Sequence, residues 1–432
     1  MAVVDNTIVT IALPSIRRDL GFSGADAGWV LNSYVLAFGG LLLVCGRAAD
    51  LWGRRRLFLA GLALFGFSSL IGGLANLPWV LVLGRVLQGV GAAAFVPASL
   101  SLLTSIFVGE KERNRAVAIY GGMAALGFVV GMVGGGVITN LLGWRWVLFV
   151  NVPVALVALL MTPVAVPEIR GEGVARVLDV PGAATVTLGL AAVIYAVTKA
   201  PEGDRNPVLV FGAAGVLLLV CFVITERRSA APLVPLDVVA AGPVAVPNVA
   251  IFLQSMIGLS WLYVLTLHFQ EVLGHGPLAA GLLFAPMTLS AVPAALIAGR
   301  LVTYFGVRLV ASTGLVLLGG GLLLMSEMGN LFLVLLGMVV GETGFMFSNV
   351  PLTIAATGGV KGDDRGLASG LMNTSSQLGN ALGLAIVATV VAAVAASGGS
   401  EDLLAGLRWG LLVCAGIVVL ALPITLFGLR RH

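Results

Sequence analysis

Apolar runs of about twenty residues, separated by short polar breaks, follow one another along almost the whole chain. That length lets an α-helix cross the roughly 30 Å hydrocarbon core of a bilayer. The runs are continuous rather than alternating, which argues against the strands of a membrane barrel. We therefore expect fourteen membrane-spanning helices. They are predicted over residues 1–16, 28–46, 57–75, 79–107, 115–140, 146–164, 180–198, 207–225, 244–269, 278–304, 308–326, 330–357, 367–396 and 408–429.

The first predicted span is shorter than the others. A helix over residues 1–16 rises about 24 Å, which is less than the thickness of the hydrocarbon core. Either the native chain starts upstream of Met1 or this span is thinned, and we expect the upstream start.

Composition supports an all-α polytopic membrane protein. Of 432 residues, 59% are hydrophobic and 10% are charged, whereas about 25% of the residues in a soluble domain are charged. The net charge of +4 resides in short connectors, so it does not indicate nucleic-acid binding. The three cysteines lie in apolar runs and the three histidines are scattered, so we expect neither a disulfide framework nor a metal site.

The basic residues are distributed unevenly between alternate connectors. Most of the 24 lysines and arginines fall in the connectors that lie inside if both chain ends are cytoplasmic. The opposite connectors hold only Arg17, Arg18, Arg145, Lys199, Arg205 and Arg408. Cytoplasmic connectors carry an excess of Lys and Arg, so we expect both the N-terminus and the C-terminus inside.

Two long polar breaks, at residues 166–180 and 226–239, bracket the seventh and eighth spans. They predict an N-terminal six-helix bundle (1–165), two inserted linker helices with their loops (166–239) and a C-terminal six-helix bundle (240–432). The basic stretch Gly46–Arg56 is weakly similar in sequence to Gly299–Arg308. An internal repeat of two helical bundles is typical of secondary transporters.

The stretch Gly46–Arg56 connects the second and third spans. Gly46 and Gly53 permit a tight turn and a close approach, and Asp50 is suited to lie near a helix N-terminus. These residues therefore suit a close contact between helices. The alternative is a plain basic turn that only orients the chain.

Three charged residues lie within predicted spans: Asp5, Arg85 and Glu342. A charge in the bilayer core is costly, so each must face protein or water and find a partner. Gln88 lies one turn from Arg85, on nearly the same face. A buried carboxylate can exchange protons near neutral pH, which predicts a proton-coupling role. The alternative is a purely structural ion pair.

Glycines recur every four residues in the fifth span, at Gly127, Gly131 and Gly135, with Gly136 beside the last. They leave a flat strip on which another helix can pack closely. A static packing seam and a sliding contact remain equally consistent with this spacing.

At these residues the chain resembles the major facilitator superfamily, and within it the fourteen-span drug:proton antiporter family. Gly46–Arg56 looks like the loop between spans 2 and 3, Arg85–Ala93 like the arginine motif of span 4, and Asp5–Pro14 like the aspartate-bearing motif of span 1. The glycine strip is similar to the antiporter motif of exporters, although Met132 stands where the family pattern has proline.

Three further stretches carry the same resemblance. Trp144–Pro153 is similar to the family's entry into span 6, and Phe269–Gly274 and Ala368–Asn373 also match its pattern. The resemblance therefore covers essentially the whole chain.

The resemblance implies a multi-pass transporter of the plasma membrane that works by alternating access as a monomer. Its partners would be a small-molecule substrate, protons and membrane lipid, with the proton gradient in place of a cofactor. The resemblance also implies a gate formed by Gly46, Asp50, Gly53 and Arg54, in which Asp50 would dock on the N-terminus of the thirteenth span. Inward proton flow would protonate a buried carboxylate and release a drug or metabolite outward.

Three aromatic residues in the C-terminal spans, Trp261, Phe345 and Phe347, are candidates for the apolar wall of a substrate pocket. We also expect Gln88, in the fourth span, to line this pocket. The chief alternative function is a uniporter or proton symporter that imports a small solute. A membrane enzyme or receptor is the third possibility. It is disfavoured because the sequence has no nucleophile constellation, metal ligands or soluble domain.

Overall fold

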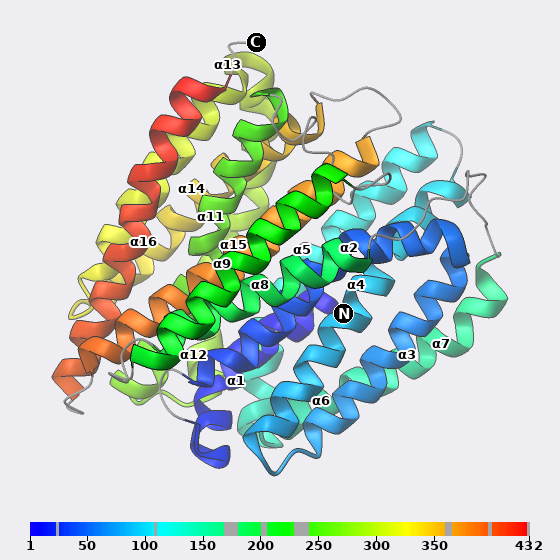
Figure 1. Ribbon diagram of the computed structural model, residues 1–432. Coiled ribbons are helices and arrows are strands. Elements are labelled where there is room, and N and C mark those ends of the chain that lie inside the picture. The colour runs from blue at the N-terminus through cyan, green and yellow to red at the C-terminus, as the bar shows by residue number, and fades with distance from the viewer. Residues whose placement is uncertain are drawn as a thin grey trace. The chain divides into compact units, whose positions relative to one another are not determined.

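The computed structural model describes residues 1–22, 26–107, 110–167, 180–199, 205–228, 242–358, 365–395 and 400–429. Every regular element within these ranges is helical (Figure 1). The predicted all-α class is therefore confirmed for this part of the chain.

The helices of the first half of the chain are α1 (Ala2–Leu20), η1 (Asp26–Gly28), α2 (Trp29–Trp52), α3 (Arg54–Gly73), α4 (Pro78–Ile106), α5 (Glu110–Leu141), α6 (Arg145–Phe149), α7 (Asn151–Ala165) and α8 (Val180–Lys199). Those of the second half are α9 (Arg205–Arg228), α11 (Gly242–Leu267), the π-helical turn η3 (His268–Val272), α12 (Pro277–Leu283), α13 (Ala285–Ser326), α14 (Leu331–Gly358), α15 (Arg365–Val394) and α16 (Ser400–Gly428).

Each of the fourteen predicted spans overlaps a helix. Within the described ranges, nine helices are long and apolar enough to cross a membrane. One of these stretches, Pro277–Ser326, contains a break at Gly306, whose φ of 76° and ψ of 162° are not helical. The two halves of α13 coincide with the tenth and eleventh predicted spans. The count of fourteen and the orientation remain predictions.

Contacts between Cα atoms group the chain into two compact units. Unit 1 comprises Met1–Ala191 and Val216–Leu233, and unit 2 comprises Ala192–Gly215 and Val234–His432. Helices α8 and α9 each contribute to both units. The predicted division into two bundles and a linker remains a prediction.

In unit 1, helix α3 packs against α4 through facing glycines, with α7 on another side of α3. A Cβ atom on Gly61 would lie 2.7 Å from the carbonyl oxygen of Gly91, and one on Gly91 would lie 2.8 Å from the backbone nitrogen of Phe65. These contacts leave no room for side chains between the two helices, as is usual where membrane helices approach closely.

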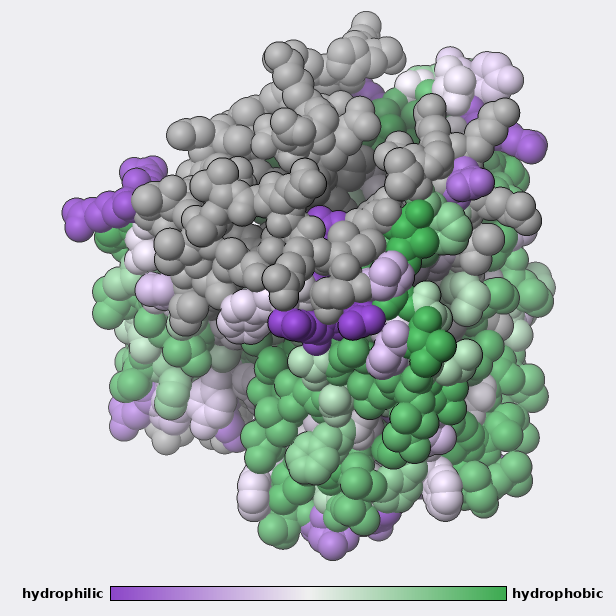
Figure 2. All heavy atoms as spheres, turned by 90° about the vertical axis from the view of Figure 1, so that its right-hand side faces the viewer, coloured by the Kyte–Doolittle hydropathy of each residue, from purple (hydrophilic) through white to green (hydrophobic). Residues whose placement is uncertain are grey.

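The outward side of α7 is strongly apolar. Leu160 is 67% exposed and Val164 is 90% exposed. Figure 2 shows the face that includes α3 and α7, and hydrophobic side chains predominate on its described part. Such a surface fits contact with lipid.

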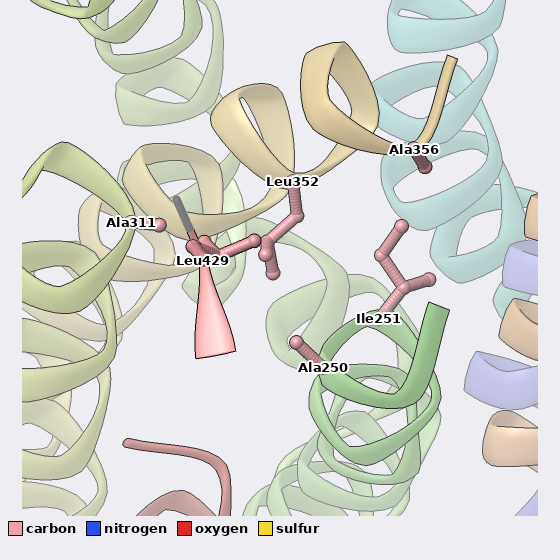
Figure 3. Close-up of a cluster of buried hydrophobic side chains, with 6 residues drawn as sticks. All are labelled: Ala250, Ile251, Ala311, Leu352, Ala356 and Leu429. Carbon is pink, nitrogen blue, oxygen red and sulfur yellow. The ribbon is translucent and has the colours of Figure 1, made fainter. Parts of the chain in front are cut away.

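In unit 2, helices α13 and α14 pack in the same glycine-mediated way. A Cβ atom on Gly321 would lie 2.5 Å from the Cα of Gly341. A cluster of buried apolar side chains from α11, α13, α14 and the C-terminal end of the described chain adds to this core (Figure 3). Its members are Ala250, Ile251, Ala311, Leu352, Ala356 and Leu429.

The weak sequence similarity between Gly46–Arg56 and Gly299–Arg308 is accompanied by a similar backbone conformation at one glycine of each stretch. Gly53 lies between α2 and α3 with a φ of 97°, and Gly306 interrupts α13 with a φ of 76°. Positive φ favours glycine, because a Cβ would clash with the backbone. Each glycine lies seven residues after the first glycine of its stretch. The two units thus share a glycine turn at the corresponding position.

Candidate functional site

Asp5 is the centre of a buried polar network in unit 1. Its Oδ2 accepts a hydrogen bond from Nη1 of Arg85 at 2.5 Å. Its Oδ1 accepts hydrogen bonds from Nε2 of Gln88 at 3.1 Å and from Nδ2 of Asn151 at 2.7 Å. Gln88 Nε2 also donates to Oγ of Ser69 at 2.6 Å. We call these five residues the Asp5 network. They come from α1, α3, α4 and α7.

Arg85 is completely buried and has further partners. Its Nε donates to the carbonyl oxygen of Val30 at 2.8 Å, and its Nη1 donates to Oε1 of Gln88 at 2.9 Å. The guanidinium lies 4.4 Å above the ring of Tyr34, a cation–π contact. Its Nη2 has no hydrogen-bond partner among the described residues. The cation is therefore paired with a carboxylate, while the two N–H groups of Nη2 have no acceptor among the described residues.

The glycine strip of α5 explains how α1 brings Asp5 to this position. Gly131 contacts Thr7, and a Cβ on Gly135 would lie 3.1 Å from the Cα of Ile8. Gly127 faces Val4 in the same way. The strip therefore packs against α1, the helix that carries Asp5. Asp5 directly follows Val4 in the sequence. Gly136 and Met132 are buried on the same helix.

A second group of polar contacts joins the C-terminal end of α1 to the start of α6. Asp19 accepts a hydrogen bond from Nε1 of Trp144 at 2.9 Å and one from Nη1 of Arg145 at 2.6 Å. Arg145 also donates to the carbonyl oxygen of Ala75 at 3.2 Å. The hydrogen bonds from Trp144 and then Arg145 hold the pKa of Asp19 below its usual value. These contacts connect three loops at one end of unit 1.

The predicted gate residues lie around the turn between α2 and α3. Gly53 is buried and forms the turn. Arg54 Nη1 lies 3.5 Å from the carbonyl oxygen of Ser101. The structure places Gly46 and Asp50 on α2, but their side-chain surroundings lie outside the described part of the chain.

Arg55, next to the predicted gate, binds the C-terminal end of α7. Its Nη1 donates to the carbonyl oxygens of Pro163 at 3.4 Å and Val166 at 3.0 Å. A cation at a helix C-terminus satisfies free carbonyls and complements the helix dipole. This arginine therefore anchors α7 to the turn.

In unit 2, the buried carboxyl of Glu342 lies within α14. Among the described residues it has no hydrogen bond and no ion pair. A Cβ on the preceding Gly341 would lie 2.7 Å from the indole of Trp261, so the Trp261 ring packs beside this residue of α14. An unpaired carboxyl and an aromatic face thus lie on neighbouring helices.

Trp261 stacks on Phe345, with ring centroids 6.4 Å apart and an interplanar angle of 24°. Gln254 Nε2 donates to the carbonyl oxygen of Phe345 at 2.8 Å and to Oγ of Ser348 at 2.6 Å. Gln254 Oε1 has no partner in the described ranges. We call Gln254, Trp261, Glu342, Phe345 and Ser348 the Trp261 cluster.

The structure brings the predicted residues together in two groups. Asp5, Arg85 and Gln88 form one group in unit 1, although Gln88 was predicted as a substrate residue rather than as a partner of Asp5. Trp261 and Phe345 stack in unit 2, and Glu342 lies on the helix of Phe345, next to Gly341, which faces Trp261. Phe347 is half-buried on α14. Their functional roles remain predictions.

Four polar members of these groups were not predicted: Ser69, Asn151, Gln254 and Ser348. Asn151 lies in the motif Trp144–Pro153, so the motif itself was a signal for it. Gln254 is a polar residue within a long apolar run, which is a weaker signal. No group of three or more His, Cys, Asp or Glu that could hold a metal ion occurs in the ranges that the structure describes.

Comparisons with known proteins identify the sequence family. Residues 1–384 and 248–432 match the family described as Major Facilitator Superfamily. The puromycin resistance protein pur8 of Streptomyces alboniger is 39% identical over 391 residues, which cover 88% of this chain and 77% of that protein. The cephamycin export protein CmcT of Amycolatopsis lactamdurans is 39% identical over 396 residues, covering 88% and 80%.

Solved structures show the same fold at low sequence identity. A bacterial homologue of the human lysosomal transporter Spinster, in an inward-facing and unoccupied conformation, gives a TM-score of 0.71 at 17% identity and covers 99% of this chain and 93% of that one. The nucleoside transporter NupG gives a TM-score of 0.70 at 14% identity, covering 99% and 96%. At these identities the likeness concerns the fold alone.

Proposed function

The chain belongs to the major facilitator superfamily, and we propose that it exports amphiphilic or cationic drugs or metabolites in exchange for protons. It is a multi-pass transporter of the cell membrane, and its substrates are small molecules. The observation that carries the proposed proton coupling is the buried Glu342 carboxyl, which has no partner among the described residues.

The names of the relatives support outward transport. Besides the puromycin and cephamycin proteins, a tetracenomycin C resistance and export protein of Streptomyces glaucescens is 32% identical over 398 residues. Because three relatives are named for resistance to, or export of, three different compounds, we propose export of organic molecules rather than uptake of one nutrient.

Glu342 is suited to carry the proton because burial disfavours the charged form of a carboxyl group. Asp5 differs, because its carboxyl oxygens accept hydrogen bonds from Arg85 and two amide donors. We propose that Glu342 binds and releases the transported proton. Protonation of Asp5 would release Arg85 and rearrange unit 1.

The Trp261 cluster supplies the chemistry for a cationic amphiphile. Trp261 and Phe345 form a stacked pair in which only Phe345 is partly exposed, and an aromatic face attracts organic cations. Gln254 Oε1 can accept a hydrogen bond. Deprotonated Glu342 would attract the cation, so the proton and the substrate would compete for the same carboxyl.

The remaining features of the proposal follow the family resemblance. We propose fourteen spans with both chain ends inside, alternating access, function as a monomer surrounded by lipid, and no cofactor besides the proton gradient. Gly46, Asp50, Gly53 and Arg54 would form the gate. Helices α1 and α5 would shift relative to each other along a contact formed by four glycines, Gly127, Gly131, Gly135 and Gly136.

Gradient-driven transport in proteoliposomes tests this proposal. We expect the wild-type protein to accumulate puromycin when a pH gradient is imposed, and Glu342→Gln to lose this accumulation because an amide cannot exchange the proton. Glu327→Gln is the matched control, since Glu327 is exposed and pairs only with Arg408 among the described residues. It should transport within about twofold of wild type, as surface ion pairs contribute little.

Two results would contradict the proposal. Unchanged accumulation by Glu342→Gln would remove this carboxyl from proton coupling. Substrate movement in the same direction as the proton, or independent of the pH gradient, would favour the symporter or uniporter alternative.

A further inference from the structure

Three residues with hydrogen-bonding side chains recur along α11 and into η3 at intervals of seven: Gln254, Trp261 and His268. Seven residues make nearly two turns of an α-helix, with a drift of about 20°, so these residues share one face. Their exposed fractions are 0%, 2% and 0%. Two of them belong to the Trp261 cluster, and His268 extends the same face beyond it.

His268 has unusual surroundings for a buried histidine. Neither Nδ1 nor Nε2 has a hydrogen-bond partner among the described residues, and the same holds for Oγ1 of Thr266. A neutral imidazole has one donor and one acceptor, and buried polar atoms nearly always have partners in proteins. Buried water commonly satisfies such atoms when several lie close together. The two ring nitrogens of His268 are therefore suited to bind buried water.

The backbone at His268 is also unusual. The amide of Leu273 donates to the carbonyl oxygen of His268 at 2.9 Å, which forms the π-helical turn. Phe269 anchors this turn through an edge-to-face contact with Phe284, with centroids 5.4 Å apart. Single π-helical turns are rare and frequently lie at functional sites.

We propose that His268 is a second proton-binding site, which delivers protons to Glu342 along the Gln254–Trp261–His268 face of unit 2. This inference rests on the proposed proton coupling. Trp261 packs against the residue before Glu342, and His268 lies seven residues further along the chain, which corresponds to about 10 Å of helix rise. Protons cross such a distance through hydrogen-bonded water. Under the proposed orientation, η3 lies at the outer end of α11.

The proton transfer changes only N–H and O–H bonds. The unprotonated ring nitrogen of His268 takes a proton from water that is in contact with the outside. The imidazolium then gives a proton to water on the side of Glu342, and the carboxylate of Glu342 accepts it. The histidine returns to its neutral form, so no other reactant is needed.

Charged groups near His268 are few. The elements packed against η3 are α11, α12 and α16. The described residues of α11 and α12 carry no charge, and α16 carries Glu401, Asp402 and Arg408. Glu271 lies in η3 itself, three residues after His268, and His275 lies in the connector to α12. Arg408 pairs with Glu327. No carboxylate binds the imidazole within the described ranges, so no ion pair would retain its proton.

Comparing gradient-driven transport with substrate exchange tests the proposal. In proteoliposomes with a pH gradient, we expect His268→Gln to transport puromycin at least about tenfold more slowly, a loss typical of removing a proton-transfer group. Exchange of labelled for unlabelled puromycin at equal pH should stay within twofold, because it needs no net proton movement. His275→Gln, seven residues further on, is the control and should match wild type in both assays.

Two outcomes would overturn the proposal: wild-type rates of His268→Gln in both assays, or equal losses in both, which would assign His268 a packing role. If the wild-type protein itself shows no gradient-driven transport of puromycin, this result refutes the proposed function. If His268→Gln does not fold, His268→Asn replaces it in both assays, and the same two results for that variant would overturn the proposal.

Discussion

Asp5 and Glu342 are both buried carboxyl groups, but their surroundings differ in kind. Asp5 accepts hydrogen bonds from Arg85, Gln88 and Asn151. Glu342 has no partner among the described residues. The first carboxylate is therefore held by a cation and two amides, while the second has no such partner within the described ranges. This difference assigns the exchangeable proton to Glu342 in our proposal.

The ion pair in the Asp5 network gives a prediction at the scale of single residues. Arg85→Gln leaves the carboxylate of Asp5 buried without its cation, which costs roughly 3–5 kcal/mol of stability. Adding Asp5→Asn removes the uncompensated charge, so the double variant should regain most of that loss. Thermal unfolding of the purified protein measures both effects. Losses that simply add would show that Asp5 and Arg85 are not energetically coupled.

Glycines determine how closely the helices approach one another. The strip on α5 contacts α1, and the glycines of α13 and α14 bring those two helices together. The four-residue spacing of Gly127, Gly131 and Gly135 predicted a flat helix face. It could not identify α1 as the partner, because a flat face accepts any helix of suitable shape.

The strip gives a prediction at the scale of helices. Gly131→Ala places a methyl group against Thr7 of α1, and such overpacking costs about 1–3 kcal/mol. Gly134→Ala is the matched control, because its methyl group would meet only Val130 of the same helix, at 4.0 Å. We expect Gly131→Ala to lower the unfolding temperature and the transport rate, with Gly134→Ala close to wild type. Equal behaviour of the two variants would exclude a close contact between α1 and α5 at Gly131.

At the scale of the whole molecule, hydropathy predicted where helices occur, because the bilayer thickness sets the length of an apolar run. The motifs predicted the family and the identity of several buried charged residues. The Asp5 network was only partly predictable. Ser69 and Asn151 are ordinary polar residues of apolar helices, and their connection to Asp5 depends on how α1, α3 and α7 pack.

The Trp261 cluster shows the same limit. Aromatic residues in spans usually pack in the core, so the sequence could suggest Trp261 and Phe345 without showing that they stack. Gln254 and His268 can be identified as candidate functional residues only from their buried polar atoms without partners in the described ranges, which the structure shows. Such atoms depend on the neighbouring helices, which local sequence does not specify.

The central claim is that substrate moves outward as protons move inward. The most direct measurement is the pH gradient that stops net puromycin flux across proteoliposomes loaded with a known puromycin gradient. For an antiporter, net flux stops when the puromycin gradient and the proton gradient point in the same direction and balance each other. A larger puromycin gradient then needs a larger pH gradient. Zero flux at equal puromycin concentrations, whatever the pH gradient, would contradict proton coupling and therefore the account.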